Sequence, residues 1–176
     1  DGTFSKCESL IEETISSTVT KIGNKSFFNC SKLESIIIPS SVTSIGKGSF
    51  KECSSLKHIE INSLITTIED ETFEKCSSLT EISIPSSVNT IGDSAFDGCS
   101  SLQIISFLSP IENNAVNSSL PQRTVQSSLN KIGNFAFNQC TSLSKFIIPS
   151  SVKSIGKNAF ENCSSLIEIE IPPSLQ

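Results

Sequence analysis

The sequence predicts a solenoid built from stacked copies of one short unit, on three observations. Cysteine recurs every 23 residues, with one longer step of 41 residues that contains 18 extra residues. Phenylalanine keeps the same timing three residues before each cysteine, and a segment of alternating apolar residues follows most cysteines. Self-similarity at a fixed period in this range is typical of solenoid proteins. The cysteines are Cys7, Cys30, Cys53, Cys76, Cys99, Cys140 and Cys163, and the phenylalanines are Phe4, Phe27, Phe50, Phe73, Phe96, Phe137 and Phe160.

The repeated unit reads I-G-x-x-(A/S/T)-F-x-x-C-(S/T)-S-L-x-x-I-x-I-P-S-S-V-x-x, and residues 68–90 are one copy of it. This unit resembles the leucine-rich-repeat superfamily, specifically the BspA-like, treponemal-type class that cysteine and phenylalanine mark, found in surface proteins of bacteria and parasitic protists. The resemblance covers nearly the whole chain apart from the 18 extra residues. It implies a right-handed solenoid of the α/β class, dominated by strands and loops. It also implies one parallel sheet on the concave face and few or no long helices.

The segment Leu-x-x-Ile-x-Ile has the period-2 pattern of a strand with one buried face. Prolines after these segments should end the strands, and Ser-Ser should form the turns. The following Val-x-x-Ile-Gly should return along the opposite side, with its glycine allowing a bend that a Cβ would obstruct. The run through Phe and Cys is too short for a stable helix, so we expect a turn or a single helical turn there. The expected strands are 33–38, 56–61, 79–84, 102–107, 143–148 and 166–171.

The domain organisation follows from the repeat. We expect residues 1–176 to form a single solenoid of seven repeats, with the terminal ones truncated, and residues 109–126 to form an inserted loop. Because the sequence starts and stops inside a repeat, we expect it to be part of a longer array or a processed product. The insertion is either a functional loop on a rigid scaffold or a tolerated surface addition.

Charge and hydropathy argue against a nucleic-acid partner and against insertion into a membrane. The net charge is −5 and the lysines are spread singly, so no basic patch suited to DNA or RNA is present. No apolar run approaches 18 residues, so no membrane insertion is expected in this sequence.

The seven cysteines favour reduced thiols over disulfides. Their number is odd, and all occupy one position of the repeat. Parallel side chains from stacked coils fit the disulfide torsion poorly, although their Cα atoms would lie within bonding range. We therefore predict a row of buried thiols, which cannot act as accessible nucleophiles or ligands and does not identify the redox compartment.

Catalytic chemistry has little support in this sequence. The single histidine, His58, falls on the open sheet face near Glu60 and Glu81. One imidazole and two flexible carboxylates make a poor zinc site, so a solvated polar patch is the preferred interpretation. No phosphate-binding loop or hydrolase motif occurs. We expect no enzyme activity, no cofactor and no metal.

The outward positions of the strands are the candidate site, because they vary while the interior positions repeat. Such solenoids bind partners through an extended concave surface. Ile37, Ile104 and Ile147 are either anchors for a protein partner or residues that simply suit a strand. The predicted protein-binding residues are Ser35, Ile37, His58, Glu60, Glu81, Ser83, Ile104, Ser106, Lys145, Ile147, Glu168 and Glu170, with Glu12 and Thr14 in the first coil.

The sequence thus indicates a non-enzymatic protein-binding module. The family resemblance implies adhesion to host, matrix or cell proteins, at the cell surface or after secretion. The alternatives are an intracellular scaffold or regulatory module in the cytoplasm, and a structural spacer of a surface protein. Exposed coil faces at both ends would also allow end-to-end self-association.

Overall fold

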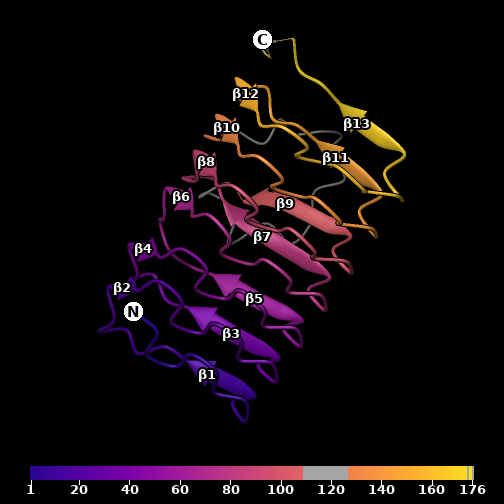
Figure 1. Cartoon of the computed structure of the whole chain (residues 1–176). Coiled ribbons are helices and arrows are strands. Elements are labelled where there is room, and N and C mark those ends of the chain that lie inside the picture. Colours follow the sequence, from indigo (N-terminus) through magenta and orange to yellow (C-terminus); the bar gives the residue numbers. More distant parts are fainter. Residues whose placement is uncertain (109–126, 174, 176) are drawn as a thin grey trace, which may run out of the picture.

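The computed structural model describes residues 1–108, 127–173 and 175 of the chain. The described residues form one stack of coils, with the two termini at opposite ends (Figure 1). They contain thirteen strands and no helix. The prediction of a parallel, strand-dominated solenoid is confirmed.

Seven strands of three to five residues lie along one side of the stack, and the inner ones, such as β5, alternate exposed with buried side chains. They are β1 (Glu12–Thr14), β3 (Ser35–Ile38), β5 (His58–Ile61), β7 (Glu81–Pro85), β9 (Ile104–Leu108), β11 (Lys145–Ile147) and β13 (Glu168–Glu170). They pair in parallel in three separate ladders, β1-β3-β5, β7-β9 and β11-β13. Equivalent repeat positions face each other, as Ile36 faces Ile59.

The predicted strands began two residues too early. The leucine at the start of each pattern belongs to the preceding turn: Leu33 donates its N–H to the carbonyl of Cys30 at 3.0 Å, and Leu56 does the same to Cys53. The leucine side chain is still buried. The predicted spacing of the buried apolar residues was therefore correct, while the predicted first residue of each strand was wrong.

Six two-residue strands return along the opposite side, as the Val-x-x-Ile-Gly pattern predicted. They are β2 (Lys21–Ile22), β4 (Ser44–Ile45), β6 (Thr67–Ile68), β8 (Thr90–Ile91), β10 (Lys131–Ile132) and β12 (Ser154–Ile155). They form two ladders, β2-β4 and β6-β8-β10-β12. Ile91 pairs with Ile132, so the 41-residue step joins adjacent coils.

The segments through Phe and Cys form turns that stack into a ridge, which we call the turn ridge (residues 24–30 and their equivalents). Within it, Lys25, Phe27 and Asn29 donate their N–H groups to carbonyls of the next coil at 2.8–2.9 Å. Two residues of each turn have φ between 53° and 73°. Left-handed backbone costs a non-glycine residue roughly 1–2 kcal/mol, and here it directs the three N–H groups along the stack, where each finds an acceptor.

The left-handed positions flank each phenylalanine two residues away on either side, and glycine fills three of them. They are Gly2, Lys6, Lys25, Asn29, Gly48, Glu52, Glu71, Lys75, Ser94, Gly98, Phe135, Gln139, Asn158 and Asn162.

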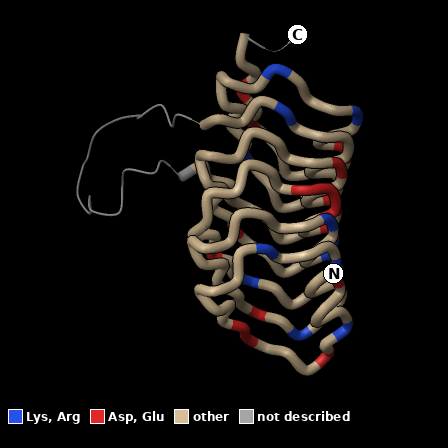
Figure 2. The backbone as a smooth tube through the Cα atoms, turned by 90° about the vertical axis from the view of Figure 1, so that its left-hand side faces the viewer, with Lys and Arg blue, Asp and Glu red and all other residues tan. Residues whose placement is uncertain are grey.

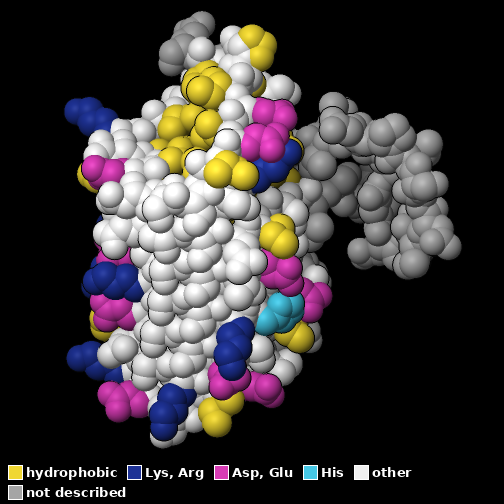
Figure 3. Space-filling view, turned by 90° about the vertical axis from the view of Figure 1, so that its right-hand side faces the viewer, with side chains coloured by type: hydrophobic (Ala, Val, Ile, Leu, Met, Phe, Trp, Pro, Cys, Tyr) yellow, Lys and Arg dark blue, Asp and Glu magenta, His cyan; other side chains and the backbone are white. Residues whose placement is uncertain are grey.

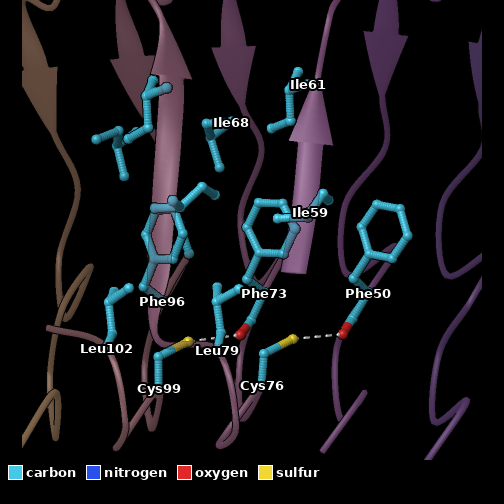
Figure 4. Close-up of a cluster of buried hydrophobic side chains, with 14 of the residues drawn as sticks. Phe50, Ile59, Ile61, Ile68, Phe73, Cys76, Leu79, Phe96, Cys99 and Leu102 are labelled. Atoms are coloured by element: carbon cyan, nitrogen blue, oxygen red, sulfur yellow. Dashed lines mark hydrogen bonds between the residues drawn. The ribbon is translucent and has the colours of Figure 1, made fainter. Parts of the chain in front are cut away.

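The core consists of rows of identical side chains (Figure 4). The seven repeat phenylalanines stack in one column, with ring centroids 5.1–5.6 Å apart and interplanar angles of 4–17°. Each such pair adds about 0.5–1.5 kcal/mol beyond its buried area. Phe146 replaces the strand isoleucine of its coil and packs beside this column, with its ring 5.2 Å from that of Phe137 and tilted by 47°.

The repeat glycines serve close packing of the coils. A Cβ on Gly92 would lie 2.6 Å from the backbone nitrogen of Asp70 in the preceding coil, and one on Gly156 would lie 2.4 Å from that of Asn134. Neither glycine has a left-handed φ. The expectation that a Cβ would be obstructed at these glycines is confirmed, and the obstruction comes from the neighbouring coil: the absent side chain lets one coil approach the next.

The Pro-Ser-Ser segments form the predicted turns after the long strands. Val42 donates its N–H to the carbonyl of Pro39 at 3.1 Å and closes the turn. The second serine reaches the preceding coil, as the Ser41 hydroxyl donates to the carbonyl of Val19 at 2.8 Å.

The inserted segment 109–126, together with its predicted loop character, lies outside the described residues. The coils on either side stack normally at the ridge, where Phe96 and Phe137 are 5.2 Å apart. Among the described residues, no helix of the length and hydropathy needed to cross a membrane is found.

We predict that Gly92→Ala lowers the free energy of unfolding by about 2 kcal/mol, because the added methyl group must push two backbones apart. Urea unfolding followed by circular dichroism measures this change. Gly48→Asn is the matched control: a Cβ there meets nothing closer than 3.6 Å, and asparagine tolerates its left-handed φ. Equal effects of the two substitutions would contradict the close-packing role.

We predict that Ser49→Ala raises the free energy of unfolding by about 1 kcal/mol, because the Ser49 hydroxyl is fully buried without a hydrogen-bond partner. The same repeat position holds buried alanine at Ala95 and Ala136. Ser26→Ala is the control, since the Ser26 hydroxyl donates to the carbonyl of Gly23 at 2.9 Å and its loss should destabilise. Thermal unfolding of the two variants should shift in opposite directions.

Candidate functional site

The outward side chains of the long strands form one continuous face, which we call the sheet face. The register of the ladders places equivalent residues side by side, so Ser35 and His58 share a row, as do Ile37 and Glu60. The intervening residues, such as Ile36 and Ile59, point into the core. Every predicted binding residue is thus on the outward side of its strand, fully or partly exposed.

Three isoleucines are open to solvent on the sheet face. Ile37, Ile104 and Ile147 expose 44%, 56% and 52% of their surface, whereas the inward strand residues Ile38 and Ile84 expose none. Burying such a side chain against a partner yields roughly 1.5–3 kcal/mol, so each is a candidate anchor.

Polar contacts on this face link neighbouring coils. Lys145 contacts Glu168 at 2.7 Å, and this hydrogen bond raises the pKa of Lys145. The hydroxyls of Ser83 and Ser106 lie 3.0 Å apart. Next to the face, Lys57 pairs with Glu34 at 2.8 Å. Exposed pairs add little stability, but they hold charged groups in a fixed pattern that a partner can recognise.

His58 and Glu60 alternate along β5, and Glu81 lies on the next long strand, β7. Glu60 accepts a hydrogen bond from the Asn62 amide at 2.9 Å. Within the described ranges, no three histidine, cysteine or acidic side chains are placed to hold a metal ion.

The cysteines are free thiols that donate hydrogen bonds across the coil boundary. The Cys76 Sγ donates to the carbonyl of Phe50 at 3.1 Å, and Cys99 donates to that of Phe73 at the same distance (Figure 4). Burial raises the pKa of Cys53 to about 12 and that of Cys76 well above its usual value. These thiols are structural donors, because a thiolate would lose both the donor proton and its solvation.

The turn ridge carries an arrangement that sequence reasoning missed. The residue after the repeat glycine is often Asp or Asn, and its side-chain oxygen accepts the backbone N–H of the next coil: Asn24 from Lys47, Asp70 from Asp93, and Asp93 from Asn134, at 2.8–2.9 Å. The hydrogen bonds that Asn134 donates to Asp93 lower the pKa of the Asp93 carboxyl group. The recurrence of Asp and Asn after the glycine was the available signal.

Charged residues also occur along the edge of the stack that the turn ridge forms (Figure 2). Lys51 contacts Glu71 at 2.9 Å and Glu74 at 2.8 Å, and Lys47 contacts Glu71 at 3.3 Å. Although burial opposes it, the hydrogen bonds to Glu74 and Glu71 raise the pKa of Lys51 to about 12. The Lys51 hydrogen bond in turn lowers the pKa of Glu71.

A broad strip beside the ridge carries neither hydrophobic nor charged side chains (Figure 3). A groove of about 450 Å³ lies here, lined in part by Ser54, Ser77 and Ser100. Their hydroxyls already bond to the preceding coil, as Ser77 donates to the carbonyl of Ser54 at 3.3 Å. The rest of the lining includes the amides of Asn29 and Gln139 and the charged groups of Glu52 and Lys75, so the groove is polar and charged at its edge.

We predict that only Cys7 and Cys163, the two half-buried thiols, react rapidly with an aromatic disulfide reagent at pH 8 in the folded protein. For a pKa of about 12, roughly one thiol in ten thousand is ionised at that pH. Thiol titration with mass mapping measures the order of modification, and unfolding in urea should release all seven. Rapid modification of Cys76 in the native protein would contradict the buried row.

Comparison with known proteins adds a family and a fold. A sequence profile of the BspA type leucine rich repeat region, in 6 copies, matches residues 1–119 and 108–176. Among functionally curated proteins, none matches the chain.

Several solved structures have the same fold. A leucine rich cell surface protein from Faecalibacterium prausnitzii A2-165 is 30% identical with a TM-score of 0.72, over 91% of this chain and 38% of that one. A leucine rich repeat protein from T. pallidum is 28% identical with a TM-score of 0.77, over 93% and 71%. One from Eubacterium ventriosum is 25% identical with a TM-score of 0.74, over 97% and 47%. The chain thus spans less than half the length of the first and third of these.

Proposed function

Because this chain belongs to the BspA-type leucine-rich-repeat family, whose profile matches both of its halves, we propose that it binds a protein partner through the sheet face. The observation that carries this proposal is the contrast between the two sides of each long strand. The inward rows repeat nearly unchanged from coil to coil, while the outward rows vary and are open to solvent. Packing between coils explains why the inward rows repeat. It does not constrain the residue types of the outward rows.

The composition of the face suits a protein partner. Its three exposed isoleucines supply apolar anchors, and two of them lie beside a carboxylate: Glu81 is the register partner of Ile104, and Glu170 is that of Ile147. Charges next to apolar anchors steer association and select partners.

We place this binding at the cell surface or after secretion, as adhesion to host, matrix or cell proteins. One structural neighbour is described as a cell surface protein, which supports this location by analogy. The role is binding and not catalysis: the interior thiols, the strongest nucleophiles in this sequence, are held protonated in the core. The competing readings are an intracellular scaffold and a structural spacer.

We predict that Ile104→Asp and Lys145→Glu each weaken binding at least tenfold, because the first removes an apolar anchor and the second reverses a charge on the sheet face. The measurement is surface plasmon resonance of the purified protein against a panel of purified matrix and cell-surface proteins. A second panel of cytosolic proteins from the same host cell type tests the scaffold reading.

The matched controls lie off the sheet face. Leu64→Asp changes an apolar residue that is 74% exposed in the segment between β5 and β6, and Lys131→Glu reverses an exposed charge on β10, so both should bind like the wild type. Saturable binding only within the cytosolic panel would favour the scaffold. Absence of saturable binding in both panels would favour the spacer, and equal loss in control and test variants would contradict use of the sheet face.

A further inference from the structure

The junction between the coils 45–67 and 68–90 differs from the other junctions among the described residues. No ladder joins β4 to β6 on the short-strand side, and none joins β5 to β7 on the long-strand side. At the preceding junction both sides are paired, β2 with β4 and β3 with β5, and at the following junction so are β6 with β8 and β7 with β9. The backbone hydrogen bonds of both ladders are therefore interrupted at this junction, although the strands on either side remain neighbours.

Sequence departures explain the interruption on the short-strand side. Glu69 replaces the repeat glycine, so its Cβ would collide with the preceding coil at the usual spacing, as the glycine contacts of 2.4–2.9 Å show. The Gly46 and Gly92 N–H groups donate to the preceding isoleucine carbonyl at 2.8–2.9 Å, whereas the Glu69 N–H makes no such bond in the described structure. A small cavity of about 60 Å³ opens here, lined in part by Ile45, Thr67 and Glu69.

A second departure removes the side-chain bond across the same boundary. Lys47 occupies the position after the glycine, where Asn24 and Asp70 each accept a backbone N–H from the following coil. A lysine has no acceptor oxygen, so the Asp70 N–H lacks this bond. On the long-strand side, residues 62–65 read Asn-Ser-Leu-Ile in place of Pro-Ser-Ser-Val.

The turn ridge nevertheless stays closed at this junction. Phe50 donates its N–H to the carbonyl of Thr72 at 2.9 Å, and Cys76 donates to the carbonyl of Phe50. Phe50 and Phe73 remain stacked, although their separation of 5.6 Å is the largest in the column. The ridge ion pairs bridge this boundary, where Lys51, whose side chain is 21% exposed, contacts both Glu71 and Glu74.

We propose that this junction is a hinge of the solenoid, at which the two strand sides part while the ridge, held by the Lys51 ion pairs, acts as the pivot. The hinge divides the sheet face into a panel of β1-β3-β5 and a panel of β7-β9 whose relative angle varies. A partner that spans both panels would select one angle. The hinge stands on the coil contacts alone and does not depend on the proposed binding.

Spin labels on one outward row of the sheet face test the hinge. The pair Glu12→Cys with His58→Cys lies within one panel, and the pair His58→Cys with Ile104→Cys crosses the junction. Both pairs span two coils, about 10 Å at the usual strand spacing. Cys7→Ala and Cys163→Ala remove the half-buried native thiols, and continuous-wave electron paramagnetic resonance measures the dipolar broadening.

We expect the pair that crosses the junction to show weaker broadening and a wider distance distribution than the pair within the panel. Lys51→Met, which removes the Lys51–Glu71 and Lys51–Glu74 ion pairs of the ridge, should widen it further, whereas Lys57→Met, which removes the Lys57–Glu34 pair within the first panel, should not. The double substitution Lys47→Asn with Glu69→Gly restores the repeat sequence and should give the two label pairs the same distance distribution. A misfolded variant could not narrow the distribution in this way. Identical distributions for both pairs in the original sequence would overturn the hinge.

Discussion

The constraint on which the structure depends is the alignment of peptide groups at the turn ridge. In each coil, three N–H groups point along the stack and meet three carbonyls of the next coil. This alignment requires two left-handed residues per turn, most of which are not glycine, and the cross-coil bonds outweigh that local cost. A single coil has no partner for these groups, which explains physically why the fold exists only as a stack.

The ridge also sets the spacing for the rest of the core. Once the peptide groups are aligned, the phenylalanine rings stack and each thiol reaches the phenylalanine carbonyl of the preceding coil. The ring stacking and the thiol hydrogen bond each recur at nearly the same distance from coil to coil. A residue that enlarges one coil therefore disturbs its boundaries with the coils on both sides. This explains why the inward rows admit few substitutions, whereas the outward rows are unconstrained and available for recognition.

The strand sides are more tolerant than the ridge. The long-strand ladder is interrupted beside the insertion, between β9 and β11, and both ladders stop between the coils 45–67 and 68–90, while ridge contacts continue through each boundary. The strand ladders are therefore shorter than the ridge, which continues through both boundaries. The proposed hinge between the coils 45–67 and 68–90 would let one extended surface fit partners of different curvature.

The sequence by itself determined the coil, the rows of identical core residues, the two strand sides and the thiol row, because a 23-residue period can be satisfied only by stacking. Even the outward row of the long strands followed from the period-2 pattern, although each strand began two residues later than predicted, since Leu33 closes a turn. Only the tertiary structure decided the left-handed ridge, the packing role of Gly92 and the open junction at Glu69. These features depend on the distance between the backbones of neighbouring coils. The pattern within one coil does not contain that distance.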